Sequence, residues 1–108
     1  MTQEEFIKIL KKKRYSYEIE GDKIIVTRER DFNFETLTSI PPGVEFSNGG
    51  NVYLDSLTSL PSDVVFDNRG DVNLEALIGG FFAGWKGNIE GIGSKRLLNL
   101  MIKRGMFI

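Results

Sequence analysis

The chain has 108 residues, a hydrophobic fraction of 41% and a charged fraction of 27%, which are the proportions of one globular domain. It contains no Cys and no His, which excludes a disulfide framework, thiolate chemistry and the commonest general base and metal ligand. The net charge is −1, no apolar run approaches the roughly 18 residues of a membrane span, and the start is not a signal peptide, so we expect a cytoplasmic protein that does not enter a membrane.

The first 28 residues predict a helix followed by a hairpin. Residues 2–14 form an amphipathic pattern that opens on a capping box of Thr2 and Glu5. Residues 15–28 alternate apolar and polar side chains on either side of a turn at 20–23, which is typical of two antiparallel strands.

From residue 23 the chain repeats with a period of about 20 residues, in rows 23–42, 43–62 and 63–82. The run Leu-Thr-Ser-(Ile/Leu)-Pro occurs at 37–41 and again at 57–61, and Asn48 and Gly50 align with Asn68 and Gly70. Apolar residues align in columns: Ile24, Val44 and Val64; Val26, Phe46 and Phe66; Phe32, Val52 and Val72; Phe34, Leu54 and Leu74; Leu37, Leu57 and Leu77. A period of this length predicts a solenoid in which equivalent strands pair in parallel.

The pattern weakens after the third row. We expect residues 83–108 to form a degenerate coil and a helix from Ser94 to about Arg104, with Gly105 placed as its C-cap. The prediction is a single domain, 1–108, with a helix–hairpin cap (1–22), three repeats (23–82) and a C-terminal cap (83–108). Its class is mainly β with helical caps (α+β), a short solenoid of three to four coils. The helices would cover the open strand edges at its two ends.

The run Leu57-Thr58-Ser59-Leu60-Pro61, followed by Val64-x-Phe66-x-Asn68, resembles a variant of the short bacterial leucine-rich repeat. The resemblance covers about residues 23–82 and implies protein–protein recognition, as in small bacterial and phage proteins. The Asn spacing departs from the usual pattern, and a second alternating stretch at 72–74 replaces the irregular side of that repeat. Both a curved horseshoe and a two-sheet β-solenoid therefore remain open.

Strand alternation places nine polar residues on an outward surface, which we call the acidic face. Its first outward column is Asp31, Asn51 and Asp71, its second is Asn33, Tyr53 and Asn73, and its third is Glu35, Asp55 and Glu75. Residues 31–80 hold eight acidic residues and one basic residue, a net charge of −7, between flanks of +2 and +4. Stacked like charges repel, so the face is interpreted as a site for a basic partner or a divalent cation, or as a solvated surface.

Two other groups of residues each allow a functional and a structural interpretation. Three aromatic residues, Phe81, Phe82 and Trp85, lie in a glycine-rich stretch. They are interpreted either as a binding hot spot or as side chains that cover the end of the core. The basic residues of 11–14 and of 95–104 would form two separate patches rather than the continuous stripe that nucleic acid needs.

The sequence predicts a protein-binding module and no enzyme, cofactor or metal site. We expect the acidic face to bind a basic surface of a protein partner, as a phage or mobile-element protein blocking a basic or nucleic-acid-binding site on a host protein would. The alternatives are an assembly protein that self-associates through its ends and, more weakly, a nucleic-acid binder that uses its basic caps. The expected state is a monomer or weak homodimer.

Overall fold

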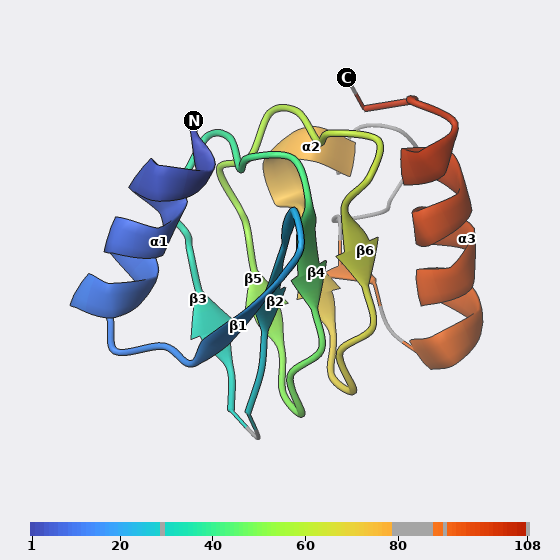
Figure 1. Ribbon diagram of the computed structural model, residues 1–108. Helices are drawn as coiled ribbons and strands as arrows, with labels where there is room; N and C mark the ends of the chain where they lie inside the picture. The colour runs from blue at the N-terminus through green and yellow to red at the C-terminus, as the bar shows by residue number, and fades with distance from the viewer. Residues whose placement is uncertain (29, 79–87, 90, 108) are drawn as a thin grey trace.

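The computed structural model describes residues 1–28, 30–78, 88–89 and 91–107, which form three helices and eight strands (Figure 1). In chain order they are α1 (Gln3–Lys12), β1 (Tyr17–Glu20), β2 (Lys23–Val26), β3 (Phe32–Asn33), β4 (Val44–Phe46), β5 (Val52–Tyr53), β6 (Val65–Phe66), β7 (Val72–Asn73), α2 (Glu75–Ile78), β8 (Asn88–Ile89) and α3 (Gly91–Lys103). None of these helices has the length and apolar character needed to cross a bilayer.

The strands form two four-stranded sheets, ordered β1-β2-β4-β6 and β3-β5-β7-β8. One edge strand of each sheet, β1 and β8, is antiparallel to its neighbour, and the other pairs are parallel. Every parallel pair joins residues 20 positions apart, such as Ile24 with Val44 and Val52 with Val72. The α+β class is therefore confirmed, and residues that the sequence period aligns are the residues that pair.

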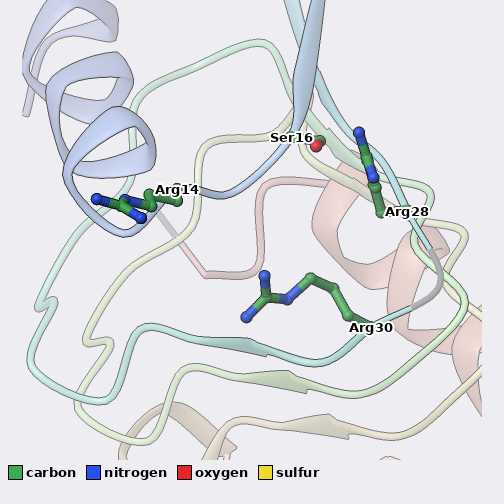
Figure 2. Close-up of a pocket in the computed structure, with 4 residues that line it drawn as sticks. All are labelled: Arg14, Ser16, Arg28 and Arg30. Carbon is green, nitrogen blue, oxygen red and sulfur yellow. The ribbon is translucent and has the colours of Figure 1, made fainter.

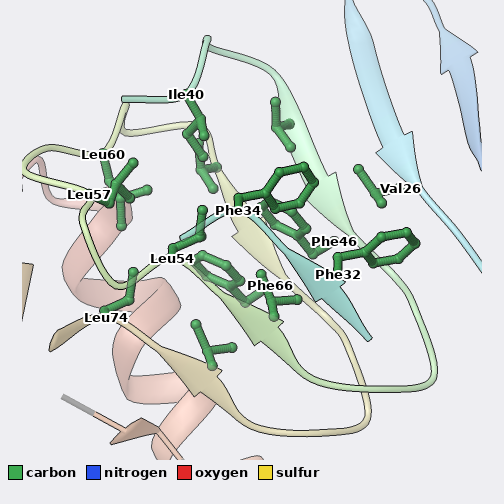
Figure 3. Close-up of a cluster of buried hydrophobic side chains, with 14 of the residues drawn as sticks. Val26, Phe32, Phe34, Ile40, Phe46, Leu54, Leu57, Leu60, Phe66 and Leu74 are labelled. Atoms are coloured by element: carbon green, nitrogen blue, oxygen red, sulfur yellow. The ribbon is translucent and has the colours of Figure 1, made fainter. Parts of the chain in front are cut away.

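The apolar columns meet between the two sheets and form the core (Figure 3). The rings of Phe34 and Phe46 lie 6.2 Å apart, and those of Phe46 and Phe66 lie 5.0 Å apart with only 5° between their planes. Each such aromatic pair stabilises the fold by about 0.5–1.5 kcal/mol beyond the contribution of its buried apolar area. Since these contacts join different rows, no row encloses a core of its own.

The N-terminal helix and hairpin are confirmed. Thr2 accepts a hydrogen bond from the Glu5 backbone and Glu5 returns one, so the capping box forms as predicted. Phe6 and Leu10 are fully buried, and the Phe6 ring lies 5.5 Å from that of Phe34. Helix α1 thus covers the first row of the core.

Helix α3 covers the opposite end of the molecule, against β6 (Figure 1). Asn99 accepts from the Phe66 backbone N–H and donates to the Phe66 carbonyl, both at 2.8 Å, as the backbone of a further strand would. The helix ends at Lys103, and Gly105 follows it as the predicted capping glycine, with φ 73°. It begins at Gly91 rather than Ser94, although glycine has a low helix propensity.

The corner that joins the two sheets is built on buried asparagines. The Asn48 side chain donates from Nδ2 to the carbonyl oxygens of Arg30, Gly50 and Asn51 at 3.0–3.3 Å. Asn68 repeats the same three bonds 20 residues later. The glycines beside Asn48 do not take a positive φ, so these side-chain bonds turn the corner rather than the left-handed backbone typical of Asn-Gly pairs.

Leu54 tests the packing of these columns. It is fully buried in the same column as Phe34 and Leu74, so Leu54→Ala should lower the free energy of unfolding by about 2–5 kcal/mol in urea denaturation. The control is Ile19→Ala, which truncates a side chain that is 56% exposed and should change the stability by about 0.5 kcal/mol or less. Equal losses in the two variants would contradict the column packing.

Candidate binding surface

The outward residues of the second sheet fall in the predicted columns. Strands β3, β5 and β7 bury Phe32, Val52 and Val72, and the register sets Tyr53 between Asn33 and Asn73. Within the acidic face, the exposed residues are Asp31, Asn33, Glu35 and Glu75, and the partly buried residues are Asn51, Tyr53, Asp55, Asp71 and Asn73.

The first outward column holds neighbouring rows together. Asp31 Oδ1 accepts a hydrogen bond of 2.7 Å from the Asn51 backbone N–H, and Asn51 Oδ1 accepts one of 2.8 Å from that of Asp71. These side chains can come so close to the next row only because a glycine precedes each bonded residue. A methyl group on Gly50 would lie 2.3 Å from Asp31 Oδ1, and one on Gly70 would lie 2.2 Å from Asn51 Oδ1. This column therefore has a structural role that the outward alternation alone did not reveal.

The second outward column carries one fixed aromatic side chain. The Tyr53 hydroxyl accepts a hydrogen bond of 2.9 Å from Asn51 Nδ2. Asn33 is used locally, because its Oδ1 accepts from the Glu35 backbone N–H at 3.0 Å. Tyr53 is thus a partly buried, anchored side chain at the centre of the face, the kind that serves as an interface hot spot.

The third outward column concentrates unpaired negative charge. Asp55 Oδ1 is buried and has no hydrogen-bond partner among the described residues. Burial raises the pKa of the Asp55 carboxyl, and the neighbouring charges of Glu35 and Glu75 raise it further. The folded state therefore holds this carboxylate at a cost, which an opposite charge would relieve.

The metal and aromatic interpretations of the sequence gain no support from the structure. Among the described residues no group of three or more acidic side chains is arranged to hold a metal ion, so nothing favours a divalent cation on the acidic face. Phe81, Phe82 and Trp85 lie outside the described residues.

The two basic segments lie at opposite ends of the molecule, on α1 and α3 (Figure 1). Lys95 is not part of a solvated patch, as the sequence suggested, because it is only 6% exposed. Its Nζ donates to the carbonyl oxygens of Asn68 and Gly70. In the preceding row the Gly50 carbonyl receives the corresponding bond from Asn68, so Lys95 replaces the asparagine of a further row.

A second polar feature escaped the sequence reasoning. Arg14, Ser16, Arg28 and Arg30 line a hollow of about 630 Å³ between the end of α1 and the loop from β2 to β3 (Figure 2). Two signals lay in the sequence: the predicted hairpin brings its two ends side by side, and Arg28 and Arg30 occupy the columns of Asn48 and Gly50 in the next row.

Comparison with protein-family models, curated proteins and solved structures finds no match to this chain. The resemblance to a short bacterial leucine-rich repeat therefore rests on the residues of the sequence alone.

The raised pKa of Asp55 predicts a pH-dependent stability. A carboxyl whose pKa is higher in the folded state destabilises the fold above that pKa, and the penalty disappears as the pH falls toward its ordinary value of 3.8. Asp55→Asn should therefore be more stable than the wild type at pH 7, with the difference in melting temperature narrowing as the pH falls. Asp63→Asn, which removes an exposed carboxylate outside the acidic face, is the control. A less stable Asp55→Asn at pH 7 would refute this explanation.

Proposed function

We propose that this chain is a non-catalytic protein-binding module, a short solenoid of three to four 20-residue coils whose acidic face binds a basic surface on a protein partner. The solenoid is supported by the register, in which each parallel pair in both sheets joins residues 20 positions apart. That register stacks equivalent outward side chains, so one repeated sequence feature becomes a continuous surface.

The observation that carries the binding proposal is the third outward column. Asp55 has a buried oxygen with no hydrogen-bond partner in the described part of the chain, and the charges of Glu35 and Glu75 add to its destabilisation. A Lys or Arg of a partner placed over the exposed carboxylates of Glu35 and Glu75 would offset the repulsion within this column, so part of the binding energy would come from relieving a cost already present in the isolated protein. The anchored Tyr53 beside this column would provide the apolar contact.

The two ends of the molecule favour this proposal over end-to-end assembly. Asn99 and Lys95 satisfy backbone groups of the last row, and α1 covers the first row. A module that polymerised through its ends would need these backbone groups for the next copy. The wide separation of the basic segments likewise weighs against a nucleic-acid groove.

The sequence supports a binding role over catalysis, since the chain has neither His nor Cys. We further propose that the partner is a protein whose own site is basic, including one that binds nucleic acid, and that a phage or mobile-element protein would use the acidic face to block it.

Charge reversal on the third outward column tests the proposal. The variant is Glu35→Lys, Asp55→Asn and Glu75→Lys, with Asn at 55 so that no lysine is forced into a partly buried position. Purified wild type and variant are immobilised, and nuclease-treated bacterial lysate is passed over each at low and at 1 M salt. We expect the wild type to retain a basic protein that the variant does not retain, with retention lost at high salt because the screening length falls to about 3 Å.

The matched control is Glu18→Lys, Glu20→Lys and Asp63→Asn, which makes the same change in net charge at exposed residues outside the acidic face. It should retain the same partner as the wild type. Equal loss in both variants would show a response to net charge alone, and equal retention by all three proteins would exclude the acidic face as the binding surface.

A further inference from the structure

The hollow at the N-terminal end of the molecule brings three permanently charged groups together. It is lined by the exposed residues Arg14, Arg28 and Arg30 together with Ser16, and the Arg30 side chain reaches from the β2–β3 loop back toward the end of α1 (Figure 2). No described carboxylate forms an ion pair with these arginines. Three guanidinium groups around one space repel one another.

Two of these arginines occupy strained backbone positions. Among the described residues, the non-glycine residues with positive φ are Arg14 at 58° and Arg28 at 99°. Positive φ disfavours any residue with a Cβ, and such strain concentrates at functional sites. Both strained residues line the same hollow. This observation is independent of the charge of the hollow.

The molecule itself shows which residue the first strained position favours. Arg14 and Tyr15 donate to the carbonyls of Lys11 and Leu10 at the end of α1, the hydrogen-bond pattern of a helix terminus that prefers glycine. Helix α3 ends with the same pattern and has Gly105 at the equivalent place, with φ 73°. Arginine therefore stands where the fold alone would favour glycine.

The other two arginines depart from the repeat. Arg28 replaces the asparagine that turns the corner in later rows, and Arg30 replaces the glycine at Gly50. A side chain at Gly50 would collide with the preceding row, within 2.6 Å of Arg30 backbone carbon. At position 30 there is room, and the Arg30 guanidinium lies 4.9 Å from the centre of the Tyr15 ring.

We propose that this arginine hollow binds the phosphate groups of a small phosphorylated molecule. Guanidinium groups donate paired hydrogen bonds that match phosphate oxygens, and the Ser16 hydroxyl can donate another. The volume of about 630 Å³ lies within the range of small-molecule sites and exceeds what one phosphate ion fills. The hollow shares no residue with the acidic face, and the proposal does not depend on the function of that face.

The test is calorimetric titration of the full chain with inorganic pyrophosphate at constant ionic strength. Arg14→Gly introduces the residue that this helix terminus favours, Arg28→Asn introduces the residue that later rows have in the same column, and Arg30→Ala removes the third cation without altering a strained position. We expect one pyrophosphate to bind the wild type and each variant to weaken binding by about tenfold or more, the effect of one lost charge-assisted hydrogen bond. Without ligand, Arg14→Gly should melt at the same or a higher temperature than the wild type.

Arg104→Gln removes an exposed arginine at the far end of the molecule and should leave pyrophosphate affinity unchanged. The proposal is overturned if the wild type does not bind pyrophosphate, or if the three hollow variants bind it as well as the wild type. A second result would also overturn the proposal: only a short single-stranded oligonucleotide binds, and Arg104→Gln weakens that binding as much as Arg30→Ala does. Binding would then come from basic charge spread over the surface and not from the hollow.

Discussion

The arrangement of this protein depends on the hydrogen bonds that Asn48 and Asn68 donate inside the corner between the two sheets. Each amide nitrogen bonds two carbonyl oxygens of its own row and one of the row before, so it turns the chain and joins successive rows at once. Each amide oxygen remains buried without a partner among the described residues. The corner therefore depends on the N–H groups of the asparagine side chain and not on its oxygen. The same hydrogen bonds recur 20 residues later.

The surfaces follow from that register. Rows held 20 residues apart stack the residues of the third outward column, which concentrates charge around Asp55. At the ends of the stack the asparagine is replaced, by Lys95 on one side and by Arg28 on the other. Lys95 closes the corner by bonding its last carbonyls, whereas Arg28 lines the arginine hollow. The same constraint thus accounts for a repeated face and for two different ends.

Much of this could be predicted from the sequence because the patterns are local. The capping box of Thr2 and Glu5, the hairpin turn at Gly21 and the apolar columns each follow from spacing. The partners of polar side chains could not be predicted in the same way. The alternation of the strand predicted an outward carboxylate at Asp31, but this side chain accepts a hydrogen bond from the next row. The sequence likewise predicted a solvated base at Lys95, which is buried. The arginine hollow lies where the two ends of the β1–β2 hairpin meet the end of α1, so the predicted hairpin brings these arginines together but no motif marks them as a site.

The most direct test of this constraint is the free energy of unfolding of Asn48→Asp at pH 7. Aspartate has the same shape as asparagine but donates no hydrogen bond, and it would place a charge against three carbonyl oxygens. If the corner depends on the amide donor, the variant should lose at least about 3 kcal/mol, as buried groups do when their partner is removed. A variant as stable as the wild type would contradict the role of these asparagines.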